Sequence, residues 1–301
     1  MDEKLCYDIV ILGNYTKDTV VSAAGTRIVD GGGFNYGAHV ASMMGLKTAA
    51  VTRLAQEDSH VVDALVRIGV AVFPTFTPCS THLRLYYPTS NVDERILTVT
   101  QTAGVFSAEQ FRGLRARTFL VNASTRGEVG PDVIHELKST GALLAADVQG
   151  FVRIISADGT LVYEDWPEKK QTLSNFDILK TDAVEAEVLT GHTDIRAAAE
   201  MIAGWGPKEI VLTHRDGVLV FADGEFCEAP FRPRKLIGRS GRGDTCIASY
   251  VAKRLTAAPP EACIWAAAVT SLKLEAEGPI KRGPDEVRQW IQQNYGTRKP
   301  E

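Results

Sequence analysis

The stretch GRSGRGDTCIASYVAKRL, residues 238–255, places glycines and arginines directly before a helical pattern. Apolar residues recur on one face of that pattern, so a helix is predicted to begin at about Gly243 or Asp244. Glycine permits positive φ, and several N–H groups can then converge at the positive end of the helix dipole. The stretch therefore predicts an anion-binding turn formed by Gly241, Arg242 and Gly243.

Asp244 lies in this turn, where a bound anion is expected. A carboxylate at a helix start usually caps the helix, but here it would repel the anion. The conflict disappears if Asp244 takes a proton from a hydroxyl group that attacks a phosphoryl group held by the turn. We therefore predict that Asp244 both caps the helix and acts as general base. The pattern of a P-loop, with its lysine, is absent from the stretch.

Outside this turn, short apolar runs alternate with helical patterns along the chain. Such alternation predicts a doubly wound α/β fold, in which helices flank both faces of a mostly parallel central sheet. The chain is expected to form a single domain over residues 1–301. The expected strands lie at 7–14, 47–54, 71–76, 118–124, 142–148, 176–182 and 209–224.

Two segments, 19–30 and 81–101, instead alternate polar and apolar residues around turn-forming residues. This pattern predicts antiparallel hairpins, which do not belong inside a parallel sheet. We expect them to form a small antiparallel β lid, built from about 15–31 and 80–102. The lid should cover the carboxyl edge of the central strands, where open α/β sheets bind ligands.

Composition favours small-molecule chemistry. The 301 residues are 45% hydrophobic and carry a formal net charge of -4, without a basic stripe or a long apolar segment. These features predict no nucleic-acid partner, no membrane association and a cytoplasmic location. The N-terminus lacks the pattern of a signal peptide. The five cysteines are scattered, which argues against a disulfide framework and a zinc site.

Four ordered motifs resemble those of the ribokinase-like, or PfkB, carbohydrate kinases, and the resemblance covers nearly the whole chain. Residues 241–244 resemble the anion-hole turn whose Asp is the catalytic base in that family. Residues 31–45 resemble its N-terminal glycine motif, and 182–191 resemble its N-x-x-E segment. Residues 211–217 resemble its nucleotide-side loop.

Two further stretches, 146–153 and 163–166, resemble the bacterial myo-inositol kinase branch of this family. Other positions depart from the family pattern and leave the substrate class and metal contacts open. Asp182 replaces the Asn of N-x-x-E, and Arg215 replaces a loop glycine. Gly238 and Arg239 replace the Asp-Thr that usually precedes the anion hole, and Tyr36 occupies the usual Asn position of the N-terminal glycine motif.

The resemblance implies roles for residues beside the catalytic Asp244 and the anion hole of Gly241, Arg242 and Gly243. Asp18 is expected to accept hydrogen bonds from polyol hydroxyl groups, and Arg153 to pair with Asp147 or with phosphate. The expected substrate-binding residues are Asp18, Gly32, Gly33, Asn35, Tyr36, Asp147 and Arg153. The expected nucleotide-binding residues are Thr213, Gly217, Arg239 and Gly278. Asp182 and Glu185 are expected to organise hydrated magnesium.

The resemblance implies an ATP-dependent, Mg2+-requiring kinase that phosphorylates a hydroxyl group of a cyclitol or sugar, with myo-inositol as the first candidate. One alternative is another sugar or nucleoside kinase of the same family. An alternative of a different class is a ligand-sensing protein with reduced activity, although the retained Asp244 and its turn favour an enzyme. The sequence leaves four points open: which hydroxyl group is phosphorylated, whether a donor other than ATP is used, whether a monovalent cation assists, and whether a homodimer forms through the lid.

Overall fold

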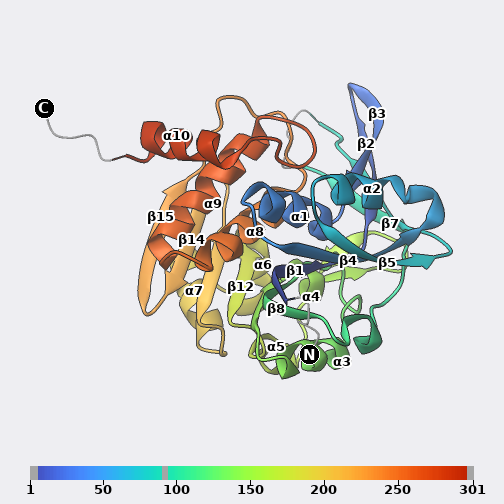
Figure 1. Ribbon diagram of the computed structural model, residues 1–301, viewed down its shortest axis with the longest axis horizontal. Helices are drawn as coiled ribbons and strands as arrows, with labels where there is room; N and C mark the ends of the chain where they lie inside the picture. The colour runs from blue at the N-terminus through green and yellow to red at the C-terminus, as the bar shows by residue number, and fades with distance from the viewer. Residues whose placement is uncertain (1–5, 90–93, 297–301) are drawn as a thin grey trace, which may run out of the picture.

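The computed structural model describes residues 6–89 and 94–296. Within them, nine strands form the central sheet (Figure 1). Seven of these strands are mutually parallel, and β14 and β15 complete one edge in antiparallel pairing. The prediction of a mostly parallel sheet is confirmed. In spatial order the strands are β15 (Glu225–Pro230), β14 (Gly217–Ala222), β13 (Glu209–Thr213), β12 (Ile178–Asp182), β9 (Leu143–Asp147), β8 (Arg115–Val121), β1 (Cys6–Leu12), β4 (Thr48–Ala55) and β5 (Ala71–Thr77).

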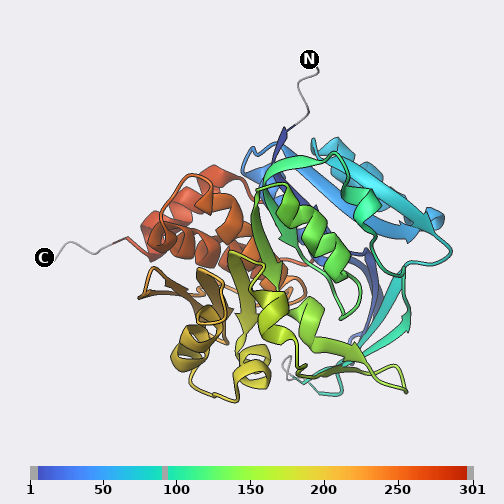
Figure 2. The same cartoon turned by 90° about the horizontal axis from the view of Figure 1, so that it is seen from below.

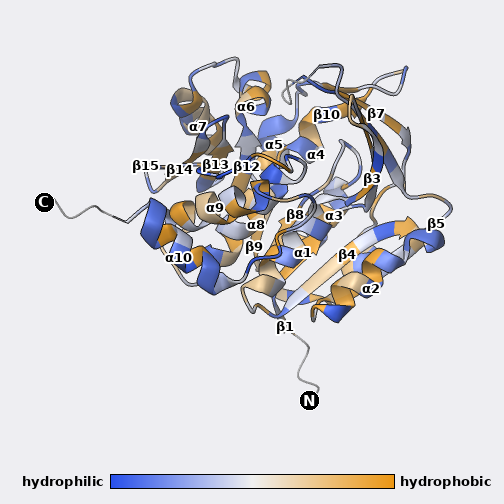
Figure 3. Cartoon of the chain, turned by 90° about the horizontal axis from the view of Figure 1, so that it is seen from above, coloured by the Kyte–Doolittle hydropathy of each residue, from blue (hydrophilic) through white to orange (hydrophobic). Residues whose placement is uncertain are grey.

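Helices flank both faces of this sheet, as predicted, because successive strand residues point to opposite faces. Ile9 and Ile11 of β1 pack into one core, and Val10 and Leu12 pack into the other. Figure 3 shows the apolar residues of the helices and strands between the layers. The first core includes residues of α1 (Gly33–Met43), α2 (His60–Arg67), α8 (Arg242–Arg254), α9 (Pro259–Leu274) and α10 (Pro284–Asn294). The second includes residues of α3 (Pro131–Ser139), α4 (Gln149–Val152), α5 (Lys169–Leu173), α6 (Ala183–Thr190) and α7 (Ile195–Ala203).

A smaller sheet of four described strands forms the lid, and its β2–β3 hairpin projects from the body of the molecule (Figure 1). Both predicted hairpins are present and antiparallel, and they join through parallel pairing of β2 with β6. That pair is parallel because β2 and β6 follow the carboxyl ends of the parallel strands β1 and β5. Residues 90–93 of the predicted lid lie outside the described residues. The strands are β3 (Gly25–Gly31), β2 (Thr16–Ser22), β6 (Thr81–Tyr86) and β7 (Ile96–Gln101).

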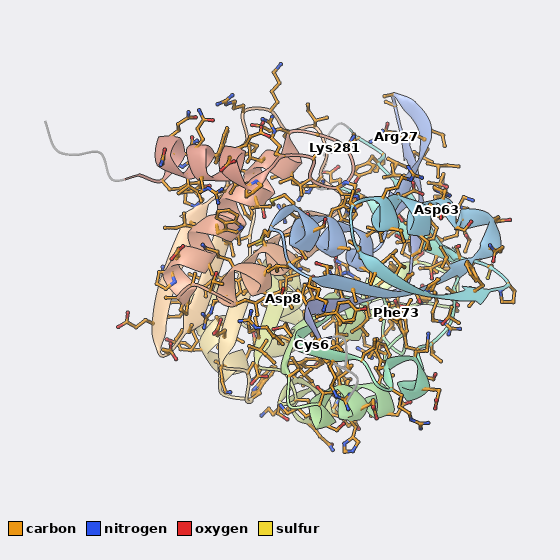
Figure 4. All side chains as sticks on the ribbon, in the orientation of Figure 1. Cys6, Asp8, Arg27, Asp63, Phe73 and Lys281 are labelled. Atoms are coloured by element: carbon orange, nitrogen blue, oxygen red, sulfur yellow. The ribbon has the colours of Figure 1, made fainter. Side chains whose placement is uncertain are left out.

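Polar contacts with other segments hold the lid in place. Arg27 lies on the projecting hairpin (Figure 4), and it pairs with Glu277 at 3.0 Å. A further hairpin, β10 (Arg153–Ile155) and β11 (Leu161–Tyr163), lies beside β7, where the Val99 N–H donates to the Gly159 carbonyl at 2.8 Å (Figure 2). No strand was predicted from the sequence for β10 and β11. The remaining elements are the 3-10 turns η1 (Gln56–Asp58) and η2 (Ala108–Phe111).

In the part of the chain that the structure describes, no helix has the length and apolar character needed to cross a membrane.

Candidate active site

A cavity of about 670 Å³ lies between the lid and the carboxyl ends of the central strands. Its walls come from strands β2, β6 and β7 of the lid, from the ends of β12 and β13, and from the turn before α8. This is the edge at which the sequence predicted a ligand site. The volume is within the range typical of small-molecule sites.

Most of the predicted site residues meet in this cavity. Those that line it are Asp18, Gly32, Gly33, Tyr36, Arg153, Asp182, Thr213, Arg239, Gly241, Arg242, Gly243 and Asp244. Five others are not among its lining residues: Asn35, Asp147, Glu185, Gly217 and Gly278.

Local packing accounts for two of these five positions. The Asn35 amide donates to the Asp30 carbonyl at 3.3 Å, which turns it toward its own chain. Gly217 opens β14 and pairs with Pro230, and a Cβ there would collide with the backbone of Ala229. The close packing of β14 against β15 therefore requires glycine at position 217, whichever phosphoryl donor the protein uses.

The turn before α8 has the backbone that its glycines predicted. Gly241 is the N-cap of α8 with φ 75°, a left-handed conformation that suits glycine. A Cβ on Gly241 would also collide with the Tyr36 ring. The helix begins at Arg242, one residue before the predicted start. The turn therefore places backbone N–H groups at the cavity, as an anion hole requires.

Asp244 does not cap the helix, so that part of its predicted role is wrong. Gly241 occupies the N-cap position, and Asp244 is the third helical residue, with its side chain at the cavity. The Gln149 amide nitrogen lies 3.3 Å from Asp244 Oδ1. Burial raises the pKa of Asp244, and the positive charges of Lys180, Arg153 and Lys273 oppose this rise. A half-buried carboxylate with few hydrogen bonds can accept a proton from a substrate hydroxyl group.

Lys180, which lies beneath the turn before α8, was not among the site residues predicted from the sequence. Its Nζ is 3.0 Å from Asp147 Oδ2 and 3.5 Å from Glu185 Oε2. A Cβ on Gly243 would approach this Nζ to 2.8 Å, so the ammonium lies directly under the anion hole. In the sequence, Lys180 is a charged residue within an otherwise apolar strand run. That exception was the one signal that could have identified it.

Arg153 pairs with Glu185 at 3.1 Å and not with Asp147, as the sequence analysis had allowed. Lys180 pairs with both Asp147 and Glu185. Asp147, Lys180, Glu185 and Arg153 thus form a mostly buried network of alternating charges at the cavity floor. Asp147 Oδ2 and Arg153 Nε nevertheless have no hydrogen-bond partner among the described residues. The four charges stabilise one another, so each member depends on the others.

Glu185 and Asp182, the two residues expected to organise magnesium, have different surroundings. Glu185 is fully buried, and its carboxylate accepts the Asp182 N–H at 2.8 Å besides pairing with Arg153 and Lys180. Asp182 caps α6 by accepting from the Glu185 N–H, yet it lines the cavity. Over residues 6–89 and 94–296, no three or more His, Cys, Asp or Glu residues form a group suited to a metal ion. A hydrated magnesium ion brought by the donor could meet Asp182 through water.

Asp18 supplies a buried acceptor that has no partner in the described protein. It is 6% exposed, it lines the cavity, and its Oδ1 accepts no hydrogen bond. Burial raises the pKa of Asp18 to about 7, with a further contribution from the charge of Asp244. The Tyr36 hydroxyl is likewise buried without a partner. Orphaned polar atoms at a cavity wall suit a ligand rich in hydroxyl groups.

Arginines line the same cavity. Arg215, Arg239 and Arg242 all line the cavity. Burial lowers the pKa of Arg239, and repulsion from Arg242 lowers it further. A bound polyanion relieves this repulsion. The cavity thus combines a carboxylate region for hydroxyl groups with a cationic region for phosphate.

Comparisons with known proteins agree with this arrangement. Residues 12–285 match the profile of the pfkB family carbohydrate kinases. A solved pyrophosphate-dependent kinase in the ribokinase family, complexed with a pyrophosphate analog and myo-inositol, is 35% identical, with a TM-score of 0.85 over 93% of this chain and 99% of that one.

A second solved structure concerns a pyrophosphate-dependent myo-inositol-1 kinase that is converted into a myo-inositol-3 kinase when an asparagine and a serine are replaced by leucines. It is 34% identical, with a TM-score of 0.86 over 96% of this chain and 100% of that one. The cytidine kinase of Thermococcus kodakarensis is 26% identical over 274 residues, which are 85% of this chain and 92% of that protein. The match to the family profile over most of the chain, together with these relatives, shows that this protein belongs to the pfkB family of carbohydrate kinases.

Proposed function

We propose that this carbohydrate kinase phosphorylates myo-inositol or a close cyclitol, and that it uses pyrophosphate as the donor. The observation that carries the proposal is that Asp18 and Asp244 line the same cavity as the arginines Arg215, Arg239 and Arg242. The two solved relatives at 34–35% identity support both the acceptor and the donor.

The distribution of lining residues favours a short donor over ATP. The residues expected to contact phosphate, Arg239 and Arg242 with the glycine turn, line the cavity. Of the residues expected to bind the nucleotide, Thr213 and Arg239 line the cavity, whereas Gly217 and Gly278 do not. Arg215 stands where the family pattern has glycine. A compact polyanion satisfies the arginines without a base-binding wall. ATP, the donor that the sequence resemblance implied, is the alternative.

In the proposed reaction Asp18 orients the polyol through its hydroxyl groups. Asp244 takes the proton from the attacking hydroxyl oxygen as that oxygen bonds to phosphorus. The bond between the transferred phosphorus and the bridging oxygen breaks, and orthophosphate leaves. The N–H groups of the turn and the arginine side chains stabilise the charge that spreads over the phosphoryl oxygens. Asp182 would hold a hydrated magnesium ion through water, and that ion would supply additional charge neutralisation.

The apolar residues of the lid support a proposal for which hydroxyl group reacts. Leu83, Leu85 and Leu97 of β6 and β7 line the cavity, so its upper wall is apolar. In the relative described above, introduced leucines favour the 3-position. We therefore propose the 3-phosphate as the product, which is the mirror image of the 1-phosphate.

The lid would also carry the contact of a homodimer, which the sequence left open. β3 pairs with β2 alone among the described strands, and its Ile28 is 62% exposed. An unpaired strand edge with an exposed apolar side chain suits pairing with a second copy.

The proposal is tested by measuring phosphate release and inositol phosphate formation with pyrophosphate or ATP as donor. The acceptor panel contains myo-inositol, its stereoisomers, ribose, hexoses and cytidine, and the blank is the Asp244→Asn variant. We expect turnover with myo-inositol and pyrophosphate, and chiral chromatography should identify the 3-phosphate. Turnover with ATP alone would overturn the donor assignment, and turnover with cytidine alone would make the nucleoside kinase alternative correct.

The pH profile gives a separate prediction. Because the pKa of Asp18 is raised to about 7, kcat/KM for the polyol should fall as the pH is lowered through about 7. Below that pH Asp18 is protonated and accepts hydroxyl hydrogens less well. The raised pKa of Asp244 acts in the same direction. The profile is measured at saturating donor, and a constant kcat/KM down to the ordinary aspartate pKa range would contradict it.

A further inference from the structure

Lys273, near the end of α9, is a buried lysine that the reaction described above does not use. It is 1% exposed, and its Nζ donates hydrogen bonds to the carbonyl oxygens of Gly238, at 2.7 Å, and Ser240. The same Nζ lies 5.4 Å from the centre of the Tyr36 ring. Among the described residues, no carboxylate lies within ion-pair distance of it.

Such an environment is unusual for an ammonium group. Burial without a carboxylate partner is costly, and lysine is almost never fully buried unless it is paired. Burial lowers the pKa of Lys273 to about 8, although the charges of Glu277 and Asp244 oppose this change. The partners that compensate the ammonium are backbone carbonyl oxygens and an aromatic face, which are also partners that potassium-like cations accept.

The segment that Lys273 holds leads directly into the anion-hole turn. The N–H groups of Ile237 and Gly238 donate to the Leu274 carbonyl at 2.9 and 3.1 Å. Helix α9 therefore holds this segment both through this carbonyl acceptor and through the Lys273 donor. A Cβ at Gly238 would collide with the backbone of Ala276, which keeps the two chains in close contact. One residue after Ser240, Gly241 adopts its left-handed conformation against Tyr36. Lys273 therefore touches both the segment before the turn and the ring behind it.

We propose that the Lys273 ammonium is a built-in monovalent cation: it draws the Gly238 and Ser240 carbonyls together and so positions the turn that ends at Asp244. This role rests on the proposed kinase function and makes Lys273 a positioning residue. A cation fixed to α9 leaves these two carbonyls saturated. The enzyme consequently needs no added potassium or ammonium ion.

The test uses Lys273→Ala, which removes the ammonium and leaves space for a small cation. Wild type and variant are assayed in potassium, ammonium, methylammonium and choline chloride at equal ionic strength. The wild type should turn over equally in all four salts. The variant should lose about 10²-fold or more in kcat in choline chloride, comparable to the loss of an oxyanion-hole donor. Ammonium or methylammonium should restore activity with a saturable dependence.

The matched control is Lys253→Ala on α8, whose lysine pairs with Glu261 at 2.7 Å away from the cavity. It should keep wild-type turnover and show no response to ammonium. Stimulation of the wild type by potassium or ammonium would overturn the proposal. A folded Lys273→Ala variant with normal kcat, or with a loss that no cation reverses, would overturn it as well. If the variant does not fold, the salt response of the wild type decides.

A second readout separates this proposal from the proposed function. The rise in melting temperature caused by pyrophosphate requires the turn but no acceptor. We expect that rise in the wild type, its loss in Lys273→Ala and its return with ammonium. If no polyol is phosphorylated while this pattern holds, the acceptor assignment fails and the role of Lys273 stands. A variant whose response to pyrophosphate equals that of the wild type contradicts the role of Lys273.

Discussion

Asp244→Asn is expected to reduce turnover by about 10⁴-fold, the upper part of the range for removing a general base. The substitution keeps the shape and removes the carboxylate that accepts the hydroxyl proton. Asp244 is the third residue of α8 and does not cap it, so the helix start is unaffected. Donor binding should therefore be retained. The measurements are kcat with myo-inositol and pyrophosphate and the affinity for pyrophosphate by calorimetry.

The control for this variant is Asp63→Asn, an exposed aspartate on α2 outside the cavity. It should match the wild type in both measurements. An Asp244→Asn enzyme with a raised KM and an unchanged kcat would show that Asp244 binds substrate without acting as a base. Normal turnover would show that another group takes the proton.

Lys180→Met is expected to lower the free energy of unfolding by about 3–5 kcal/mol, because it leaves buried charges without a partner. Asp147 and Glu185 are both 0% exposed, and the Lys180 ammonium lies 3.0 Å and 3.5 Å from their carboxylates. Methionine fills a similar volume, so the loss arises from charge more than from packing. Thermal unfolding followed by circular dichroism should show a drop of about 10 °C.

The chain offers a matched control in Lys208→Met. Lys208 pairs with Asp177 at the same 3.0 Å distance, but its side chain is 77% exposed. Its removal should cost less than about 1 kcal/mol, since water solvates the partner. Adding Asp147→Asn to Lys180→Met should recover part of the lost stability, because the double change removes one uncompensated carboxylate. If Lys180→Met and Lys208→Met are equally stable, the buried network contributes no more than a surface pair.

The Lys180 substitution also tests how the floor of the site affects catalysis. The positive charge of Lys180 opposes the rise in the pKa of Asp244. Without it, that pKa should rise further, and Asp244 should remain protonated to a higher pH. The acid limb of kcat should therefore move to higher pH in the Lys180→Met variant.

Local sequence patterns determined the elements of this protein and the turn at its centre. Continuous apolar runs predicted the buried strands, and Gly241 with Gly243 before an amphipathic helix predicted the anion-binding turn, because these preferences act over a few residues. Asp18 and Asp244 could be identified for the same reason, since each lies in a short motif. Polar and apolar residues alternate with a period of two in segments 19–30 and 81–101, and each segment forms the antiparallel hairpin that this pattern predicts.

Tertiary structure alone decided the partners of the charged residues. Lys180 in its strand and Lys273 in its helix could each have faced solvent, and only packing against the α8 turn makes both buried. Lys180 pairs with Asp147, and Arg153 pairs with Glu185. These pairings join residues about 30 positions apart, and a pattern of neighbouring residues cannot specify which opposite charges meet when the elements pack.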